Sequence, residues 1–306
     1  MAVLSTKRLV ESLDRTLIQQ SQALCDLGVK PGLSAILVEG DPSSVAYYHA
    51  KRRLADKLGI AFHGTKLPAD APTDDVLQAL HRHAGDPCIH GVFLEMPLPP
   101  HIDVTAIRNA IPLAKDVDCV SEAAFGRLLV RSSHISTADL RSMSPATPLA
   151  VMELLRSAEI PVAGAHAVVV GRSLTVGRPL ALLLLAENAT VTVCHSHTTD
   201  LTAHTRHADI LCVAAGRPHL IGRQHIRPGA VVIDIGIHAT SDGLVGDVDT
   251  QAVADLAAWV TPVPGGVGAL TTRMIFANLL QSAQLATRCV PSTDSTLDPH
   301  KERPSS

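Results

Sequence analysis

Short runs of apolar residues alternate along this chain with segments of helical length, and this alternation restricts the fold more than any other feature. Ser34–Val38 and His166–Val170 have the length and composition of buried strands, and a segment with helical periodicity follows each of them. Strands that alternate with helices build a parallel sheet covered by helices on both faces. The sequence therefore predicts an α/β protein. We expect strands at 34–38, 60–65, 89–95, 166–170, 190–194, 210–214 and 230–235, and helices at 44–58, 73–83, 150–157, 177–187 and 270–286.

Local signals place the ends of some of these helices. Leucines recur every four residues from Leu9 to Leu17, which predicts an amphipathic helix before the first strand. We expect Ser43 or Ser44 to cap the helix at 44–58 and Gly59 to end it, because serine and glycine favour those two positions.

The length of 306 residues, at about 150 residues per domain, favours two domains. The alternation weakens between residues 111 and 148 and restarts at residue 150. We therefore expect a first domain at 1–147 and a second, Rossmann-like domain at 148–269. Residues 289–306 carry Pro, Ser, Thr and charges without apolar periodicity, so we expect a disordered tail there.

Composition argues against several classes of protein. A net charge of −3 and 2% aromatic residues give no reason to expect a nucleic-acid partner. The most apolar run, at 180–186, is far shorter than the roughly 20 residues that span a bilayer. Residues 1–20 contain no uninterrupted apolar core of a signal peptide, so we expect a cytoplasmic protein. The six cysteines and 16 histidines show no metal-binding spacing, so we expect no metal site.

A dinucleotide site is indicated where the strand His166–Val170 runs into a turn that contains Gly171 and Gly177. Backbone N–H groups at the start of the following helix can hold a pyrophosphate, although a turn that only reverses the chain is the alternative. The next strand ends at 195–198 (His-Ser-His-Thr) with no acidic residue to bind a ribose 2′-hydroxyl. With Arg172 nearby, this favours NADP over NAD, although the two histidines are equally consistent with a solvated strand end.

Several motifs together resemble the methylenetetrahydrofolate dehydrogenase/cyclohydrolase family. They occur in the family's order and approximate spacing, and the resemblance extends over residues 5–287. The motifs are Tyr-Tyr-His-Ala-Lys at 47–51, Pro-Leu-Pro at 97–99, Lys-Asp-Val-Asp at 115–118, Gly-Arg-Ser at 171–173 with Val-Gly at 176–177, Cys-His-Ser at 194–196, Gly-Asp-Val-Asp at 246–249 and Thr-Pro-Val-Pro-Gly-Gly-Val-Gly at 261–268.

The resemblance implies two α/β lobes around a cleft, with the last helix, at 270–288, returning to the first lobe. It implies that NADP oxidises 5,10-methylenetetrahydrofolate to the methenyl form, which is then hydrolysed to 10-formyltetrahydrofolate. It also implies a homodimer.

The resemblance assigns roles to three residues of the first lobe. Tyr47 would stack on the aminobenzoate ring of the folate, Lys51 would be the catalytic lysine, and Asp118 would hydrogen-bond the pterin. The spacing of Tyr47 and Lys51 places both on one face of a helix. Without the resemblance, Lys51 is a solvated helix lysine in a charged run and Asp118 caps a turn.

The remaining site residues follow from the same resemblance. Proline and glycines near the last helix give a rigid backbone without side chains, which a flat substrate can approach closely, although an ordinary loop is the alternative. The predicted substrate contacts are Leu94, Met96, Pro264, Gly265, Gly266, Val267 and Gly268. The predicted cofactor contacts are Gly171, Arg172, Ser173, Val176, Gly177, Ser196, His197, Thr198 and Ile237.

The chain departs from the family pattern at four positions: Glu95 replaces a glutamine, Cys119 a glycine, Ala146 a cysteine and Ala269 a proline. Glu95 is the most informative, because in the family this residue lies beside the catalytic lysine. A carboxylate there would hold Lys51 as an ammonium and weaken hydrolysis. Alternatively, Glu95 is itself the base, or the substrate has changed. We expect Ala269 to loosen its loop slightly.

The leading hypothesis is therefore an NADP-dependent methylenetetrahydrofolate dehydrogenase in which the hydrolysis step is open. A paralogue that oxidises a different substrate is one alternative, motivated by Glu95 and Cys119. A catalytically weak protein that binds folate or NADP is the other, and the presence of Lys51 argues against it.

Overall fold

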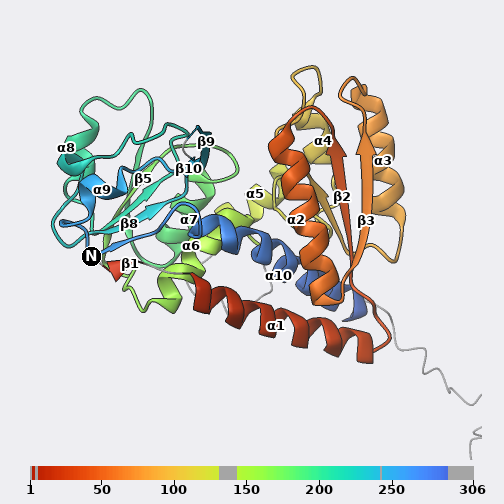
Figure 1. Ribbon diagram of the computed structural model, residues 1–306. Coiled ribbons are helices and arrows are strands. Elements are labelled where there is room, and N and C mark those ends of the chain that lie inside the picture. The colour runs from red at the N-terminus through yellow and green to blue at the C-terminus, as the bar shows by residue number, and fades with distance from the viewer. Residues whose placement is uncertain (1, 4–5, 131–142, 242, 289–306) are drawn as a thin grey trace, which may run out of the picture.

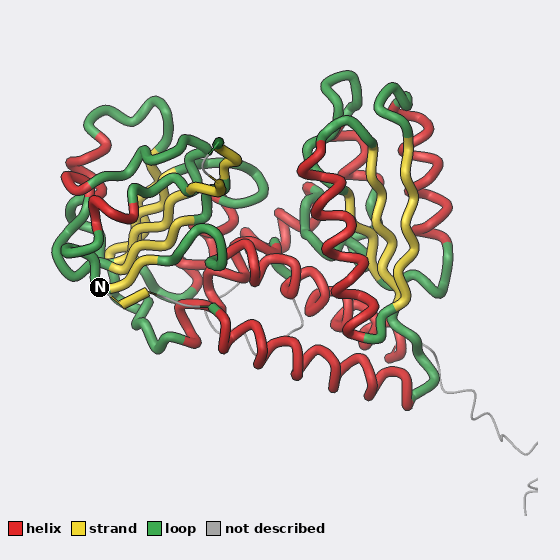
Figure 2. Tube along the Cα trace, in the orientation of Figure 1, coloured by secondary structure: helices red, strands yellow, loops and turns green. Residues whose placement is uncertain are grey.

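The computed structural model describes residues 2–3, 6–130, 143–241 and 243–288. Two parallel sheets lie in two lobes, and helices cover them (Figures 1 and 2). The predicted α/β fold is confirmed. The expected tail at 289–306 lies outside the described residues, as does part of the weakly patterned segment, at 131–142.

The first lobe is built on a three-stranded sheet with the order β3-β2-β4. All seven residues of the central strand β2 are buried, because the strand has a neighbour on each side and helices on its faces. Its strands are β2 (Gly32–Val38), β3 (Ala61–Leu67) and β4 (Gly91–Leu94), and its helices are α2 (Pro42–Leu58), α3 (Thr73–Gly85), α4 (Val104–Ala110) and α5 (Glu122–Leu129).

The second lobe contains a six-stranded sheet with the order β1-β11-β8-β7-β5-β6, in which every neighbouring pair is parallel. The four strands predicted from residue 166 onward are present, within a residue or two of the expected ends. The strands are β5 (His166–Val170), β6 (Thr190–Cys194), β7 (Ile210–Val213), β8 (Val231–Asp234) and β11 (Trp259–Val260). The other elements are α7 (Gly177–Ala186), α8 (Leu201–Thr205), the 3-10 turn Arg223–His225, the antiparallel hairpin β9 (His238–Thr240) and β10 (Gly243–Val245), and α9 (Thr250–Val253).

The N-terminal strand β1 (Ala2–Val3) pairs with β11, so the start of the chain joins the sheet of the second lobe. The predicted first domain, at 1–147, includes these residues. A two-residue strand has no periodicity of its own, so only its partner identifies it.

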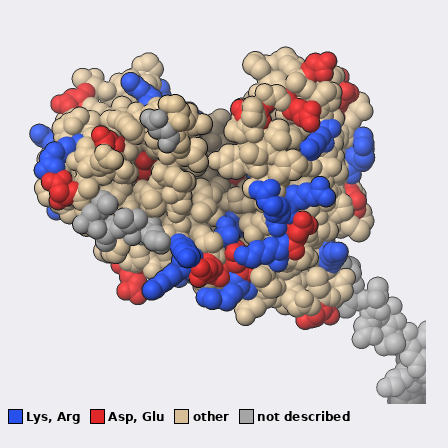
Figure 3. Space-filling view, in the orientation of Figure 1, with Lys and Arg blue, Asp and Glu red and all other residues tan. Residues whose placement is uncertain are grey.

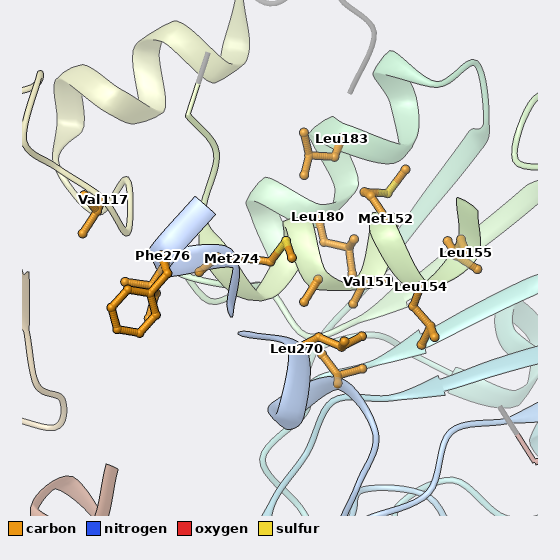
Figure 4. Close-up of a cluster of buried hydrophobic side chains, with 14 of the residues drawn as sticks. Val117, Val151, Met152, Leu154, Leu155, Leu180, Leu183, Leu270, Met274 and Phe276 are labelled. Carbon is orange, nitrogen blue, oxygen red and sulfur yellow. The ribbon is translucent and has the colours of Figure 1, made fainter. Parts of the chain in front are cut away.

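Three helices connect the lobes: the long helices α1 (Lys7–Asp26) and α10 (Val267–Arg288), and the shorter α6 (Ala146–Ser157). Figure 4 shows α10 and α6 contributing side chains to one buried cluster, which extends from Phe276 and Val117 to Leu155. The same cluster includes Leu33 of the first sheet and Val169 of the second. The two lobes therefore share a core. Within the described ranges, no helix is both long and apolar enough to cross a bilayer.

The ends of two helices differ from expectation. Helix α2 begins at Pro42, and Asp41 caps it by accepting the N–H groups of Ser43 and Ser44 at 2.6 and 3.2 Å. The prediction of a serine cap was wrong, because the aspartate reaches both orphan N–H groups. Gly59 ends this helix in the left-handed conformation, with φ +70°, as predicted. Helix α10 begins at Val267 rather than at residue 270.

Candidate functional site

A cavity of about 260 Å³ lies between the lobes and is lined by residues from both. Figure 3 shows the hollow between them, with mostly uncharged walls on this face. The first lobe contributes Tyr47, Lys51, Phe93, Glu95, Met96 and Asp118, and the other lining residues are Thr147, Thr175, Val176, Ile235, Ile237, Val267, Gly268, Thr271, Thr272 and Ile275.

Lys51 and Glu95 form a buried ion pair in this cavity. Tyr47 and Lys51 are four residues apart on α2, and both side chains face the cavity. The Lys51 Nζ atom lies 2.8 Å from Glu95 Oε2, and the two side chains are 5% and 2% exposed. The ammonium also lies 4.2 Å from the centre of the Phe93 ring. A carboxylate and an aromatic face both stabilise the charged amine.

The second carboxylate oxygen of Glu95 is buried and has no hydrogen-bond partner among the described residues. Burial raises the pKa of Glu95, and the charge and hydrogen bond of Lys51 lower it only in part. A buried acceptor without a partner is costly. Among the described residues, this oxygen is therefore an acceptor whose hydrogen-bonding capacity is unused.

The alternation of side chains along β4 determines which residues near Glu95 reach the cavity. The backbone N–H of Glu95 donates to Ile36 O at 2.9 Å, so the strand-like path continues beyond Leu94. Successive side chains of a strand point to opposite faces, so Phe93 and Glu95 face the cavity while Leu94 packs in the core with Ile36. The prediction that Leu94 contacts substrate is therefore not supported by its position. Met96 lines the cavity as expected.

Asp118 faces the same cavity from the loop before α5. Its carboxylate accepts the N–H of Ala146 at 3.3 Å, at the start of α6. The pKa of Asp118 is raised to about 7, mainly by burial and also by the nearby Asp116 and Glu95 charges, while the Ala146 N–H and Lys51 oppose the increase. Near neutral pH this carboxyl is therefore present in both protonation states.

Cys119, beside Asp118, adopts a left-handed backbone conformation with φ +50°. The family has glycine here, and only glycine adopts this region without steric cost. The Cys119 side chain is buried, and its Sγ lies 3.5 Å from the carbonyl of Asp116. Cys119 thus shapes the turn behind Asp118 and does not line the cavity.

The glycine-rich segment borders an adjoining cavity of about 170 Å³, which includes Pro264, Gly265 and Gly266 and shares Tyr47 with the main cavity. Gly265 has φ +94°, and a Cβ atom at Gly266 would collide with the carbonyl of Pro262. The segment thus depends on its glycines.

Val267 and Gly268 line both cavities from the first turn of α10. Ala269 follows them and donates its N–H to Gly266 O at 3.2 Å. A proline could not make this bond. Instead of loosening the loop as expected, Ala269 adds a hydrogen bond to it.

A third cavity, of about 570 Å³, lies at the carboxyl ends of β5, β6 and β7. Gly171 turns the chain with φ +124°, and a Cβ atom there would collide with the carbonyl of Ala214. Ser173 Oγ accepts the N–H groups of Val176 and Gly177 at 3.2 and 3.3 Å, at the start of α7. The loop thus ends at the N-terminus of α7, where free backbone N–H groups can bind a phosphate group.

The lining of this cavity fits a 2′-phosphate. It includes Arg172, Ser196, Thr198 and Arg217 and contains no acidic residue. The pKa of His195 is lowered by partial desolvation and by the charges of Arg172 and His197. The residues present therefore fit NADP.

The cofactor residues predicted from sequence divide into groups. Gly171, Arg172, Ser173, Ser196 and Thr198 line this third cavity, and their contact with the cofactor stays a prediction. Val176 and Ile237 instead line the cavity between the lobes, His197 lines none of the cavities described here, and Gly177 is buried against Gly171.

The structure adds lining residues that sequence reasoning missed. Arg217 follows the strand β7, and the carboxyl ends of parallel strands form the ligand edge, so its position was a usable signal. His195, which the sequence pattern had already indicated at the end of β6, also lines this cavity. Thr147, Thr271 and Ile275 come from α6 and α10 and carried no signal.

Two family models match the chain. Residues 4–118 match the catalytic domain of tetrahydrofolate dehydrogenase/cyclohydrolase, and residues 145–287 match the NAD(P)-binding domain of that family. The chain belongs to the tetrahydrofolate dehydrogenase/cyclohydrolase family.

The sequences of related proteins are similar to this chain over most of its length. It is 48% identical over 259 residues to bifunctional protein FolD 1 of Rubrobacter xylanophilus, covering 84% of this chain and 88% of that one. It is 41% identical over 283 residues to bifunctional protein FolD of a Parafrankia species, covering 92% and 99%.

Solved structures show the same architecture. The bifunctional FolD enzyme of Campylobacter jejuni has a TM-score of 0.88 and 35% identity, covering 93% of this chain and 99% of that one. FolD of Trypanosoma brucei, complexed with NADP cofactor and inhibitor, has a TM-score of 0.87 and 34% identity, covering 94% and 99%. The predicted family, two-lobed fold and enzyme class are confirmed: this is a dehydrogenase/cyclohydrolase of tetrahydrofolate with an NAD(P)-binding second lobe.

Proposed function

We propose that this enzyme uses NADP to oxidise 5,10-methylenetetrahydrofolate in the cavity between the lobes and hydrolyses the methenyl product to 10-formyltetrahydrofolate. The observation that carries this proposal is the meeting of Tyr47, Lys51 and Asp118 in one cavity whose opposite wall belongs to the NAD(P)-binding lobe. Bound NADP supplies the hydride acceptor.

Each of these three residues has a role that its position supports. Tyr47 is 45% exposed and offers its ring face to the aminobenzoate of a folate. Asp118 is a carboxyl acceptor for the pterin N–H groups. Hydride transfer asks mainly for alignment of two rings, whereas hydrolysis needs a proton acceptor and a proton donor. The Lys51 ammonium is placed to be that donor.

We propose NADP rather than NAD because of the charges around the third cavity. Arg172 and Arg217 are its two arginines, and Ser196 adds a hydroxyl donor. Guanidinium groups match phosphate oxygens in geometry and charge. An acidic residue would have served a ribose hydroxyl, and none lines this cavity.

We propose that the lobes divide the work as the sequence suggested. Residues 1–147 and the helix at 270–288 would hold the folate, and residues 148–269 the NADP. The packing of α10 against both α1 and α6 supports this division, because it holds the two binding surfaces at a set separation.

We propose that two copies of the chain form a homodimer through β6. This strand ends the six-stranded sheet, so within the described residues its outer edge has no strand partner. Val193 on β6 is 39% exposed and Leu185 on the adjacent α7 is 59% exposed. A second copy would cover both residues and the open edge. Val193→Lys should then shift sedimentation from dimer to monomer.

A cytoplasmic location is also part of the proposal. Five of the six cysteines lie in the described part of the chain, and all five are free thiols. Free thiols are typical of reducing compartments. Fractionation of cells that express the full chain tests this.

The decisive experiment measures both activities on purified protein. NADPH formation is followed with 5,10-methylenetetrahydrofolate and NADP, and decay of 5,10-methenyltetrahydrofolate is followed separately. Both activities are expected. Slow methenyl decay beside normal NADPH formation would mean that Glu95 weakens hydrolysis. Folded protein that binds NADP but shows neither activity would refute the proposed substrate.

A further inference from the structure

Hydrolysis in this cavity requires a base other than Lys51. The Lys51 amine donates to Glu95 at 2.8 Å and lies over the Phe93 ring, so its contacts favour the ammonium form. An ammonium can donate a proton but cannot accept one. Where the family has a neutral glutamine beside the lysine, this chain has the carboxylate of Glu95. A carboxylate can accept a proton and a glutamine cannot, so the roles of proton donor and proton acceptor can be distributed differently between the two residues.

Glu95 has the geometry of the missing base. Its Oε2 atom is occupied by Lys51, whereas its Oε1 atom is buried and has no partner in the described part of the chain. The Glu95 side chain is 2% exposed and lines the cavity with Tyr47 and Asp118. Oε1 itself is almost fully covered in this structure, so a water molecule that enters with the substrate donates to it once the Glu95 side chain turns this oxygen toward the cavity.

We infer that Glu95 is the general base of methenyl hydrolysis in this chain, and that Lys51 is its proton-donating partner. This inference rests on the proposed function of the same cavity. It assigns to the unpaired carboxylate oxygen the task of accepting a proton from the attacking water.

The proton balance closes with these two residues. Water attacks the methenyl carbon, a C–O bond forms, one water proton moves to Glu95, and the C=N electron pair moves to the ring nitrogen. The Lys51 ammonium then protonates N5 as the C–N5 bond breaks. The neutral amine of Lys51 takes back the hydroxyl proton as the formyl C=O forms. Glu95 releases its proton to solvent, so methenyl cation and water give 10-formyl product and one proton.

Three other titratable groups bear on Glu95: Lys51 and Tyr48 from α2, and Asp118 from the opposite loop. The hydrolysis rate should rise with pH as Glu95 loses its proton. The pKa of Asp118 is also raised, so the contributions of the two carboxyls must be separated. The rising limb should be lost in Glu95→Gln and retained in Asp118→Asn.

The central test is Glu95→Gln, which keeps the shape of the side chain and removes the base. A positioned base contributes about 100-fold or more to such a step. The ratio of the hydrolysis rate to the NADPH-formation rate should therefore fall about 100-fold. An unchanged ratio would overturn the inference. A raised ratio would also overturn it and would identify Lys51, released from its partner, as the base.

Glu153→Gln is the matched control, because it makes the same chemical change in the Glu153–Arg156 ion pair of α6, outside the cavities described here. It should leave the ratio unchanged. Glu95→Ala provides a second test: added formate should restore hydrolysis in proportion to its concentration. No rescue by formate would count against a base role.

The two levels of the proposal fail differently. If the unmodified enzyme forms no NADPH from 5,10-methylenetetrahydrofolate, the proposed function fails. If NADPH forms and the hydrolysis ratio of Glu95→Gln does not fall, only the role of Glu95 fails.

Discussion

Asp14 joins three helices through one nearly buried carboxylate, and its replacement should weaken the contact between the lobes. The carboxylate accepts Arg273 Nε and Nη2 of α10 at 2.7 and 3.0 Å, and Lys57 Nζ of α2 at 2.7 Å. The Asp14 and Arg273 side chains are 7% and 15% exposed, whereas Lys57 is 56% exposed. The paired Arg–Asp contact therefore dominates.

The magnitude follows from this burial. Removing one partner of a fully buried ion pair costs about 3–5 kcal/mol, and an exposed pair contributes about 0–1 kcal/mol. Asp14→Asn keeps one oxygen acceptor and leaves Arg273 partly solvated, so we expect a loss of about 2 kcal/mol. Such a loss corresponds to a decrease in Tm of roughly 4–8 °C, at about 2–4 °C per kcal/mol for proteins of comparable size.

The pH dependence adds a second test. Burial alone would raise the pKa of Asp14, but the hydrogen bonds and charges of Arg273 and Lys57 outweigh it and hold the pKa below its usual value. A carboxyl whose pKa is lower in the folded state stabilises the fold above its unfolded-state pKa of about 3.9, and this contribution is lost as pH falls through the folded-state pKa. The difference between the unmodified protein and Asp14→Asn should be full at pH 7 and shrink below about pH 4.

Urea unfolding at pH 7 and at pH 3.5 measures both effects. Asp255→Asn is the control, because it breaks an exposed pair with Arg223 and should leave the unfolding midpoint nearly unchanged. If Asp14→Asn unfolds at the same urea concentration as that control, or if its deficit is as large at pH 3.5 as at pH 7, the reasoning is wrong.

Three further predictions concern the two binding cavities. The raised pKa of Asp118 means that the folded state binds its proton more tightly than the unfolded state, so the unmodified protein loses stability as pH rises from about 4 to 8. Asp118→Asn should remove this loss, and the free energy of unfolding of the variant, relative to the unmodified protein, should be higher at pH 8 than at pH 5 in urea titrations. Arg172→Gln should raise KM for NADP about tenfold and leave KM for NAD nearly unchanged, since one charge-assisted contact contributes about 1.5–3 kcal/mol. Equal effects on the two KM values would exclude a contact between Arg172 and the 2′-phosphate. The buried Asp247 carboxylate holds the loop that carries Arg217, because it accepts the N–H groups of residues 215, 216 and 217 at 2.6–3.0 Å. Asp247→Asn should therefore raise KM for NADP more than KM for the folate, and equal increases in both would point to a general loss of folding.

Patterns in the sequence are sufficient to predict the α/β class, most strands and the family. These features depend on local patterns: a strand such as His166–Val170 is recognised by its own apolar run, and the turn at Gly171 by its own glycine. The ordered motifs were enough to predict a folate-oxidising enzyme with a nicotinamide cofactor, because each motif occupies consecutive residues.

Tertiary structure alone decided which side chains meet. Lys51 and Glu95 are 44 positions apart, and their 2.8 Å contact depends on how α2 packs on the sheet that contains β4. The same strand turns Leu94 into the core, which the family resemblance did not reveal. Asp14 and Arg273 are 259 positions apart. Local periodicity specifies backbone conformation, whereas such contacts follow from packing between elements, so the unpaired oxygen of Glu95 becomes visible only in the folded chain.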